Sequence, residues 1–242
     1  MEMNVLGSSS EGNCYLFRAR DGETLIVECG IPMREIKRGL GFDISKVSGC
    51  LVTHRHKDHA RSVAEMCGMG IRVYAPADVF DAVSLSSPFS SRVLPYERFR
   101  AGSYGVMAVP AMHDVPCVTY FIHHEEMGWT VFMTDSVSLS AKPKTVSHVM
   151  IECNYSDEIL GENIERGILH RSQRDRLMVS HCSLSACVGI LKRISLAGCR
   201  DITLLHLSHS NSDPKLFRQT VEGATGVVTH VAEPGLKVDF TI

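Results

Sequence analysis

Residues 49–59 read GCLVTHRHKDH, and this stretch decides the fold. It begins as an apolar run typical of a buried strand and changes into a cluster of histidines around one aspartate. Side chains alternate between the two faces of an extended chain, so His54, His56 and Asp58 can point the same way. His59 follows where the chain turns into a helix, so it can face a second point in space. The segment thus offers two imidazoles to one cation, and a carboxylate with an imidazole to a neighbouring cation.

The complete pattern His-x-His-x-Asp-His predicts a metal site, whereas an isolated His-x-His pair is often only a polar loop. Three later residues repeat the change from apolar to polar at the end of a predicted strand: His113, Asp135 and His206. A buried imidazole or carboxylate costs several kcal/mol unless it is paired or bound to metal. Each of the three alone could be a hydrogen-bonded core residue. Together with the first motif they become candidate ligands, and Asp135 could bridge two cations.

The bulk composition describes an ordinary globular chain. Its 242 residues are 44% hydrophobic and 21% charged, which predicts one domain over residues 1–242. The net charge of −2 excludes nucleic-acid binding by global positive charge and leaves a local basic groove open. Nine cysteines without a CxxC pair favour free thiols in an intracellular protein. The N-terminus has no signal-peptide pattern, and no apolar run approaches the ~20 residues of a membrane span, so we expect a cytoplasmic protein with no membrane partner.

The order of elements predicts an α/β (α+β) fold with two sheets and helices outside them, because strands dominate and do not alternate strictly with helices. We expect strands at 13–17, 24–28, 47–53, 71–75, 104–110, 117–123, 129–134, 148–153, 177–180 and 202–207, with two more within 226–240. We expect helices at 58–67, 76–83, 157–173, 183–196 and 214–221.

At these motifs the chain resembles the metallo-β-lactamase superfamily over nearly its whole length. The resemblance implies a four-layer αββα sandwich and two divalent cations, with zinc expected first and manganese or iron as alternatives. It divides the ligands into two sets joined by a bridging aspartate: His54, His56 and His113 for one cation, Asp58, His59 and His206 for the other, and Asp135 between them.

Within the superfamily the chain is most similar to the YycJ-type (WalJ) branch of exonucleases. Residues 6–15 look like the serine-rich first loop of that branch, and residues 151–155 look like its Glu-x-Asn element. An aspartate rather than a cysteine at the bridging position favours phosphodiesters over lactams, although Glu28 stands where the superfamily usually has aspartate. The resemblance implies a nuclease that hydrolyses DNA phosphodiester bonds with a metal-bridged hydroxide. A phosphodiesterase of cyclic nucleotides or other small phosphodiesters remains the alternative.

Two residues are predicted to take part in catalysis beyond metal binding. Asp58 would orient the nucleophile or accept its proton, and His181 would protonate the leaving oxygen, with a helix-capping role as its alternative. The expected phosphate pocket is lined by polar residues whose alternative is a merely polar turn: Ser8, Ser9, Ser10, Asn13 and Ser208. Aromatic residues make up only 7% of the chain, and the sequence shows no base-stacking platform. A homodimer stays open.

Overall fold

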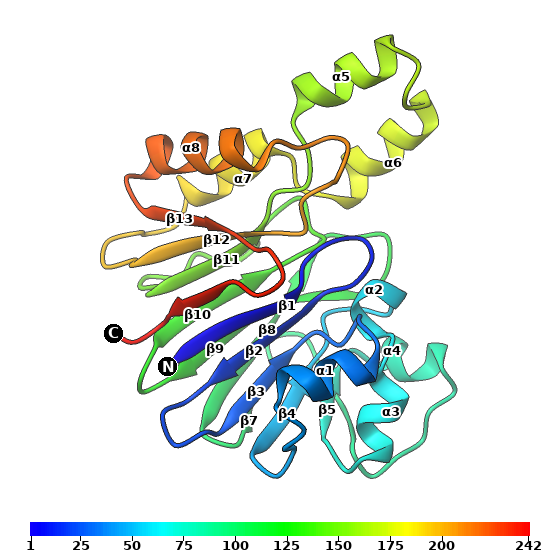
Figure 1. Cartoon of the computed structure of the whole chain (residues 1–242), viewed down its shortest axis with the longest axis vertical. Coiled ribbons are helices and arrows are strands. Elements are labelled where there is room, and N and C mark those ends of the chain that lie inside the picture. The colour runs from blue at the N-terminus through cyan, green and yellow to red at the C-terminus, as the bar shows by residue number, and fades with distance from the viewer.

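The computed structural model describes the backbone of residues 1–242 and every side chain except those of Arg171 and Gln173. Two seven-stranded sheets pack face to face, and helices lie against the outer faces of both (Figure 1). This is the four-layer αββα sandwich that the sequence predicts. Among the helices described, none is long and apolar enough to cross a membrane.

The first sheet contains the N-terminal strands in the order β14-β1-β2-β3-β4-β5-β6. Its strands are β1 (Glu2–Gly7), β2 (Cys14–Arg18), β3 (Thr24–Val27), β4 (Val47–Leu51), β5 (Val73–Ala75), β6 (Ser90–Arg92) and β14 (Lys237–Asp239). The strands β14, β1, β2 and β3 are antiparallel neighbours, and β3 to β6 are parallel. The carboxyl ends of β3 and β4 therefore meet at one edge of the sheet.

The second sheet has the order β13-β12-β11-β10-β9-β8-β7. Its strands are β7 (Arg98–Ala101), β8 (Tyr104–Ala111), β9 (Cys117–His124), β10 (Gly128–Met133), β11 (His148–Glu152), β12 (Asp201–Leu205) and β13 (Val228–Val231). The strands β7 to β10 are antiparallel neighbours and β10 to β13 are parallel. The strands β8, β10, β11 and β12 thus run in one direction and end at the same edge.

The helices form the outer layers. Beside the first sheet lie α1 (Met33–Gly39), α2 (Lys57–Ala60), α3 (Val63–Gly68) and α4 (Ala77–Ala82), and over the second lie α7 (Leu184–Leu191) and α8 (Pro214–Thr225). The remaining pair, α5 (Asp157–Glu165) and α6 (Arg171–Ser180), projects beyond the sheets at the top of Figure 1. The candidate site lies in the loops at the edge of the sandwich where β4, β8, β10 and β12 end.

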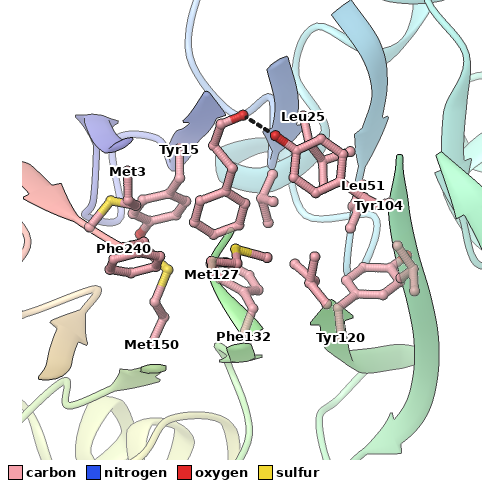
Figure 2. Packing of buried hydrophobic residues seen from close by; sticks show 14 of the residues in the cluster. Met3, Tyr15, Leu25, Leu51, Tyr104, Tyr120, Met127, Phe132, Met150 and Phe240 are labelled. Carbon is pink, nitrogen blue, oxygen red and sulfur yellow. Dashed lines mark hydrogen bonds between the residues drawn. The ribbon is translucent and has the colours of Figure 1, made fainter. Parts of the chain in front are cut away.

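The inner faces of the two sheets enclose the main apolar core (Figure 2). The aromatic side chains of Tyr15, Tyr104 and Phe132 are fully buried there. Each such burial contributes about 1.5–3 kcal/mol. The hydroxyl of Tyr104 donates a hydrogen bond of 2.8 Å to the carbonyl of Phe17, so its polar end is satisfied in the core. This core fixes the two sheets relative to each other, and with them the strand ends that carry the site.

The helix predicted at 58–67 is divided into α2 and α3. The chain turns at Ser62, whose backbone N–H donates to the carbonyl of Cys29 (2.9 Å) and whose hydroxyl donates to the carbonyl of Ile31 (2.8 Å). These two tertiary hydrogen bonds interrupt the helical pattern, and the apolar periodicity gives no sign of them.

The strand predicted at 177–180 is wrong, because these residues form the last turn of α6. The N–H of His181 donates to the carbonyl of Leu177 (2.9 Å), and the hydroxyl of Ser180 donates to the carbonyl of Arg176 (2.7 Å). A short apolar run alone does not distinguish a strand from a helix end. The two C-terminal strands do form, but they join different sheets: β13 pairs with β12, and β14 with β1.

Candidate metal centre

The predicted ligands converge because they follow strands that end at the same side of the sandwich. His54 follows β4, and α2 then carries Asp58 and His59. His113 follows β8, Asp135 follows β10 and His206 follows β12. In each case a buried strand runs into a polar residue just beyond the last ladder hydrogen bond, so the side chain reaches the space between the sheet edges.

The first group of ligand atoms belongs to His54, His56, His113 and Asp135, which lie within 4.8 Å of one another. Nε2 of His113 lies 3.2 Å from Nδ1 of His56, and Nε2 of His54 lies 3.6 Å from Oδ2 of Asp135. The structure therefore brings together the set that the sequence assigns to one cation.

The second group belongs to Asp58, His59, Asp135 and His206, again within 4.8 Å of one another. Oδ2 of Asp58 lies 3.1 Å from Nε2 of His206 and 3.2 Å from Nε2 of His59. Oδ2 of Asp135 lies 3.4 Å from Nε2 of His59. Asp135 belongs to both groups, so its position is that of the expected bridge.

The residues present fit divalent cations. Nε2 of His54 is buried, points into the first group and has no hydrogen-bond partner among the described residues. Buried polar atoms are almost always satisfied, and a bound cation would satisfy this one. Imidazole and carboxylate donors suit zinc, manganese and iron.

The charges in the centre favour ionised carboxylates. Burial would raise the pKa of Asp135, but the nearby imidazoles of His206 and His59 outweigh it and hold that pKa well below its ordinary value. Burial likewise opposes the charge on Asp58, and hydrogen bonds from His206 and His59 again lower its pKa. Both aspartates are therefore ready to act as ligands near neutral pH.

Glu28 lies behind the ligands and orients two of them. Its side chain is completely buried, and its Oε1 accepts a hydrogen bond of 2.6 Å from the hydroxyl of Thr53. That hydroxyl lies 2.9 Å from Nδ1 of His54, and Oε1 itself lies 3.4 Å from Nδ1 of His59. The Thr53 hydroxyl thus holds the His54 imidazole by Nδ1, and the Glu28 carboxylate faces Nδ1 of His59 without a hydrogen bond, so that both rings turn Nε2 toward the centre. The glutamate that departs from the family pattern still supplies a carboxylate at this place.

The first loop packs closely against the ligand segment. Asn13 is buried, and its Nδ2 donates to the carbonyls of Ser9 (3.0 Å) and Asp58 (3.1 Å). A Cβ added to Gly30 would lie 1.7 Å from the carbonyl oxygen of Asp58, so only glycine allows this approach. The hydroxyl of Ser8 accepts a hydrogen bond of 3.0 Å from the N–H of His206. Asn13 and Ser8 are therefore engaged in holding the ligand backbone.

Three of the five predicted substrate residues line a cavity beside the ligands. Ser8, Ser9 and Ser208 line this cavity of about 670 Å³, whereas Ser10 is exposed and does not line it. The hydroxyl of Ser208 accepts a hydrogen bond from the N–H of Asn211 (3.3 Å). None of the seven predicted ligands lines the cavity, so it adjoins the centre without containing it.

His181 approaches the second group from the end of α6, and Glu152 holds it there. Oε1 of Glu152 lies 2.7 Å from Nδ1 of His181, and Oε2 accepts from the N–H of Cys182 (3.1 Å). Burial alone would lower the pKa of His181, but the Glu152 carboxylate overrides it and raises that pKa to about 9. Nδ1 of His181 is also 4.0 Å from Oδ1 of Asp135. From the sequence, Glu152 has no predicted role beyond its place in the Glu-x-Asn element.

Three buried residues at strand ends have a left-handed backbone. They are Glu28 (φ 63°), Asp135 (φ 47°) and His206 (φ 54°). This conformation costs on the order of 1–3 kcal/mol for a residue other than glycine and persists only where the surroundings enforce it. It turns each side chain sharply away from its strand and toward the centre.

Comparison with known proteins agrees with this geometry. The model of the metallo-beta-lactamase superfamily matches residues 9–68. The exodeoxyribonuclease YycJ of Bacillus anthracis is 25% identical over 239 residues, which covers 91% of this chain and 88% of that protein. The metallo-beta-lactamase fold protein YhfI of Bacillus subtilis superimposes with a TM-score of 0.75 at 17% identity, over 98% of each chain. A diphosphatase of the PhnP family gives a TM-score of 0.69 at 16% identity, over 98% of this chain and 96% of that chain. The chain resembles YycJ in sequence. It shares its fold with YhfI, a metallo-beta-lactamase fold protein, and with the diphosphatase.

Proposed function

We propose that this metal-dependent hydrolase of the metallo-β-lactamase fold is a nuclease that cleaves DNA phosphodiester bonds. The observation that carries the proposal is the two adjacent ligand groups that share Asp135, beside a third group in which Asp135 and His206 meet Glu152 and His181. His54, His56 and His113 would hold one cation, and the second group would hold the other. Two neighbouring divalent cations supply charge for the oxygens of a phosphodiester and lower the pKa of water. The similarity to an exodeoxyribonuclease favours DNA as the substrate.

The chain's own residues would move the protons. The side chain of Asp58 is partly exposed at the edge of the centre, where its carboxylate would orient the attacking water and accept its proton. His181 would donate a proton to the leaving oxygen, and its hydrogen bond to the buried Glu152 keeps Nε2 turned away from that partner and available. The acid and the base thus stand on separate elements, α6 and α2.

A phosphodiesterase acting on small substrates is the second candidate, and the cavity beside the centre favours it. Its rim carries Glu11 and Glu233 with one arginine, Arg61, while the third glutamate of the rim, Glu35, is paired with arginines outside the cavity. The rim thus offers little positive charge to a continuing phosphate chain and tolerates a single small phosphodiester. The structural likeness to a diphosphatase is consistent with a small substrate.

A metal-reconstituted screen of linear DNA, RNA and cyclic dinucleotides distinguishes the two candidates. We expect turnover of linear DNA that disappears in His56→Ala and Asp135→Ala and persists in His230→Ala, whose imidazole lies on β13 away from the centre. Turnover of cyclic dinucleotides without DNA cleavage would select the second candidate. Full activity in the two ligand variants would show that the proposed centre is not the catalytic one.

A further inference from the structure

A groove of about 540 Å³ lies on the outer face of the second sheet, away from the ligand groups. The helices α7 and α8 lie over the β11–β13 side of this face (Figure 1). Over β8 to β10 the face is instead flanked by the segment 139–146, which follows Asp135 along the chain. The groove opens between this segment and β7.

The floor of the groove is aromatic and apolar. Met107 on β8 faces Phe121 on β9, and Trp129 on β10 is the only tryptophan of the chain. The Trp129 side chain is 39% exposed, and its ring centroid lies 4.9 Å from that of His123. The neighbouring Gly105 has nothing within 4 Å of the position of a Cβ, which leaves the surface beside the indole open. A flat ring can therefore lie against Trp129.

The wall of the groove is cationic. Arg98 on β7 and Lys142 and Lys144 in the segment 139–146 line it, and no aspartate or glutamate does so among the described residues. The described residues also form no ion pair with these three cations. In a chain with a net charge of −2, this concentration of unneutralised positive charge favours a polyanion.

The same segment joins the groove to the centre. It leaves Asp135, forms a bridge between Leu139 and Ala111 at the end of β8, and reaches Lys142. Trp129 lies opposite His123, and His123 lies opposite Gly105, six residues before Ala111 on β8. From Ala111 back to the level of Trp129, β8 therefore spans about 20 Å at 3.3 Å per residue. About six stacked nucleotides at 3.4 Å each would cover that distance.

We propose that this groove binds single-stranded nucleic acid about six nucleotides from the scissile phosphate, with a base stacked on Trp129 and phosphates against Lys142 and Lys144. Stacking aromatic residues beside a cationic wall is the combination that single-strand binders use. The inference rests on the proposed nuclease function for the position of the scissile bond, but binding in the groove does not require cleavage.

Trp129 itself reports on binding. We expect a 12-nucleotide oligodeoxythymidylate to quench its fluorescence in the metal-free, full-length protein. In Lys142→Ala/Lys144→Ala the dissociation constant should rise about tenfold, and the slope of log affinity against log salt should fall by about 1.4, or 0.7 for each lost phosphate contact. The matched control Lys215→Ala/Lys237→Ala removes two lysines outside the groove and should leave both quantities unchanged. In Trp129→Ala, followed with a labelled oligonucleotide, affinity should fall roughly five- to a hundredfold.

Three outcomes overturn the inference. They are absent quenching at low salt, equal binding by polyglutamate, or equal loss in the control variant. Substrate length separates this inference from the proposed function. If both hold, the lysine variant keeps the wild-type kcat/KM on bis(p-nitrophenyl) phosphate and shows a raised KM only on oligonucleotides longer than about six nucleotides. Specific quenching without any DNA cleavage would support the groove and contradict the nuclease.

Discussion

Replacing Glu28 by glutamine should weaken metal binding without unfolding the protein. The substitution keeps the shape of the side chain and an acceptor for the Thr53 hydroxyl, which lies 2.6 Å from Oε1 in the wild-type protein. It removes the negative charge that lies 3.4 Å from Nδ1 of His59. Loss of a partner that orients a ligand typically costs 10–100-fold in metal affinity. This corresponds to about 1.4–2.8 kcal/mol.

The metal-free variant should not lose stability in the same way. Burial raises the pKa of Glu28, and the nearby His59 and the Thr53 hydrogen bonds lower it only in part. The pKa of Glu28 is higher in the folded state than in the unfolded state. Ionisation of this carboxyl therefore opposes folding, and it does so increasingly as the pH rises from the unfolded-state pKa through the folded-state pKa. Glutamine has no such ionisation, so the metal-free variant should melt at or above the wild-type temperature at pH 7.

Two measurements check this pair of expectations: zinc or manganese competition against a chromophoric chelator, and thermal unfolding in EDTA. Thr53→Val should also weaken metal binding because His54 loses its partner, whereas Thr53→Ser keeps the hydroxyl and serves as the control. Wild-type metal affinity in Glu28→Gln would refute the orienting role. A large fall in the metal-free melting temperature would show that Glu28 is instead a structural residue.

Four further predictions concern the acid, the cations, the core and the tight approach. Because Glu152 raises the pKa of His181 to about 9, wild-type kcat should fall above that pH, and Glu152→Gln should move this limb down by about one unit or more in a pH–rate profile. Removing both cations with a chelator should lower the melting temperature by roughly 10–20 °C, measured against protein with metal at a hundred times the dissociation constant of each site. Phe132→Ala should cost about 3–5 kcal/mol in urea unfolding with metal ligands unchanged, since it opens a cavity between the sheets. Gly30→Ala should abolish high-affinity metal binding in the same competition assay, because its Cβ would displace the Asp58 carbonyl; wild-type affinity would contradict this close approach.

The sequence predicts which residues converge, because His113, Asp135 and His206 stand at a change from apolar to polar residues just past a strand and the others follow β4 in one motif. His113 and His206 are found in this way although they lie far from the first motif. The same pattern predicts the two sheets and the position of most strands. Local composition carries this information, since a half-buried strand that leads to a buried polar group is unusual without a ligand.

Features that depend on tertiary contacts were not predictable. The strand β1 and the helix α1 have no counterpart among the elements predicted from the sequence. Two hydrogen bonds from Ser62 to distant carbonyls produce the break between α2 and α3, and nothing in the helical pattern shows it. Glu152 looks like any buried-strand residue until the fold brings it within 2.7 Å of Nδ1 of His181. The groove around Trp129 combines residues from five separate segments, so the low aromatic content of the sequence did not reveal it.

Backbone angles combined with burial would locate this centre. Among the described residues, the other non-glycine positions with positive φ, at Phe42, Ser84 and Tyr96, are exposed, so burial and φ together select only the three strand-end residues of the centre. A search for buried left-handed residues, blind to histidines, would find it. The same feature sets stability against metal binding: glycine at these strand ends would relieve the backbone, so keeping a glutamate, an aspartate and a histidine there costs stability that the rest of the fold supplies.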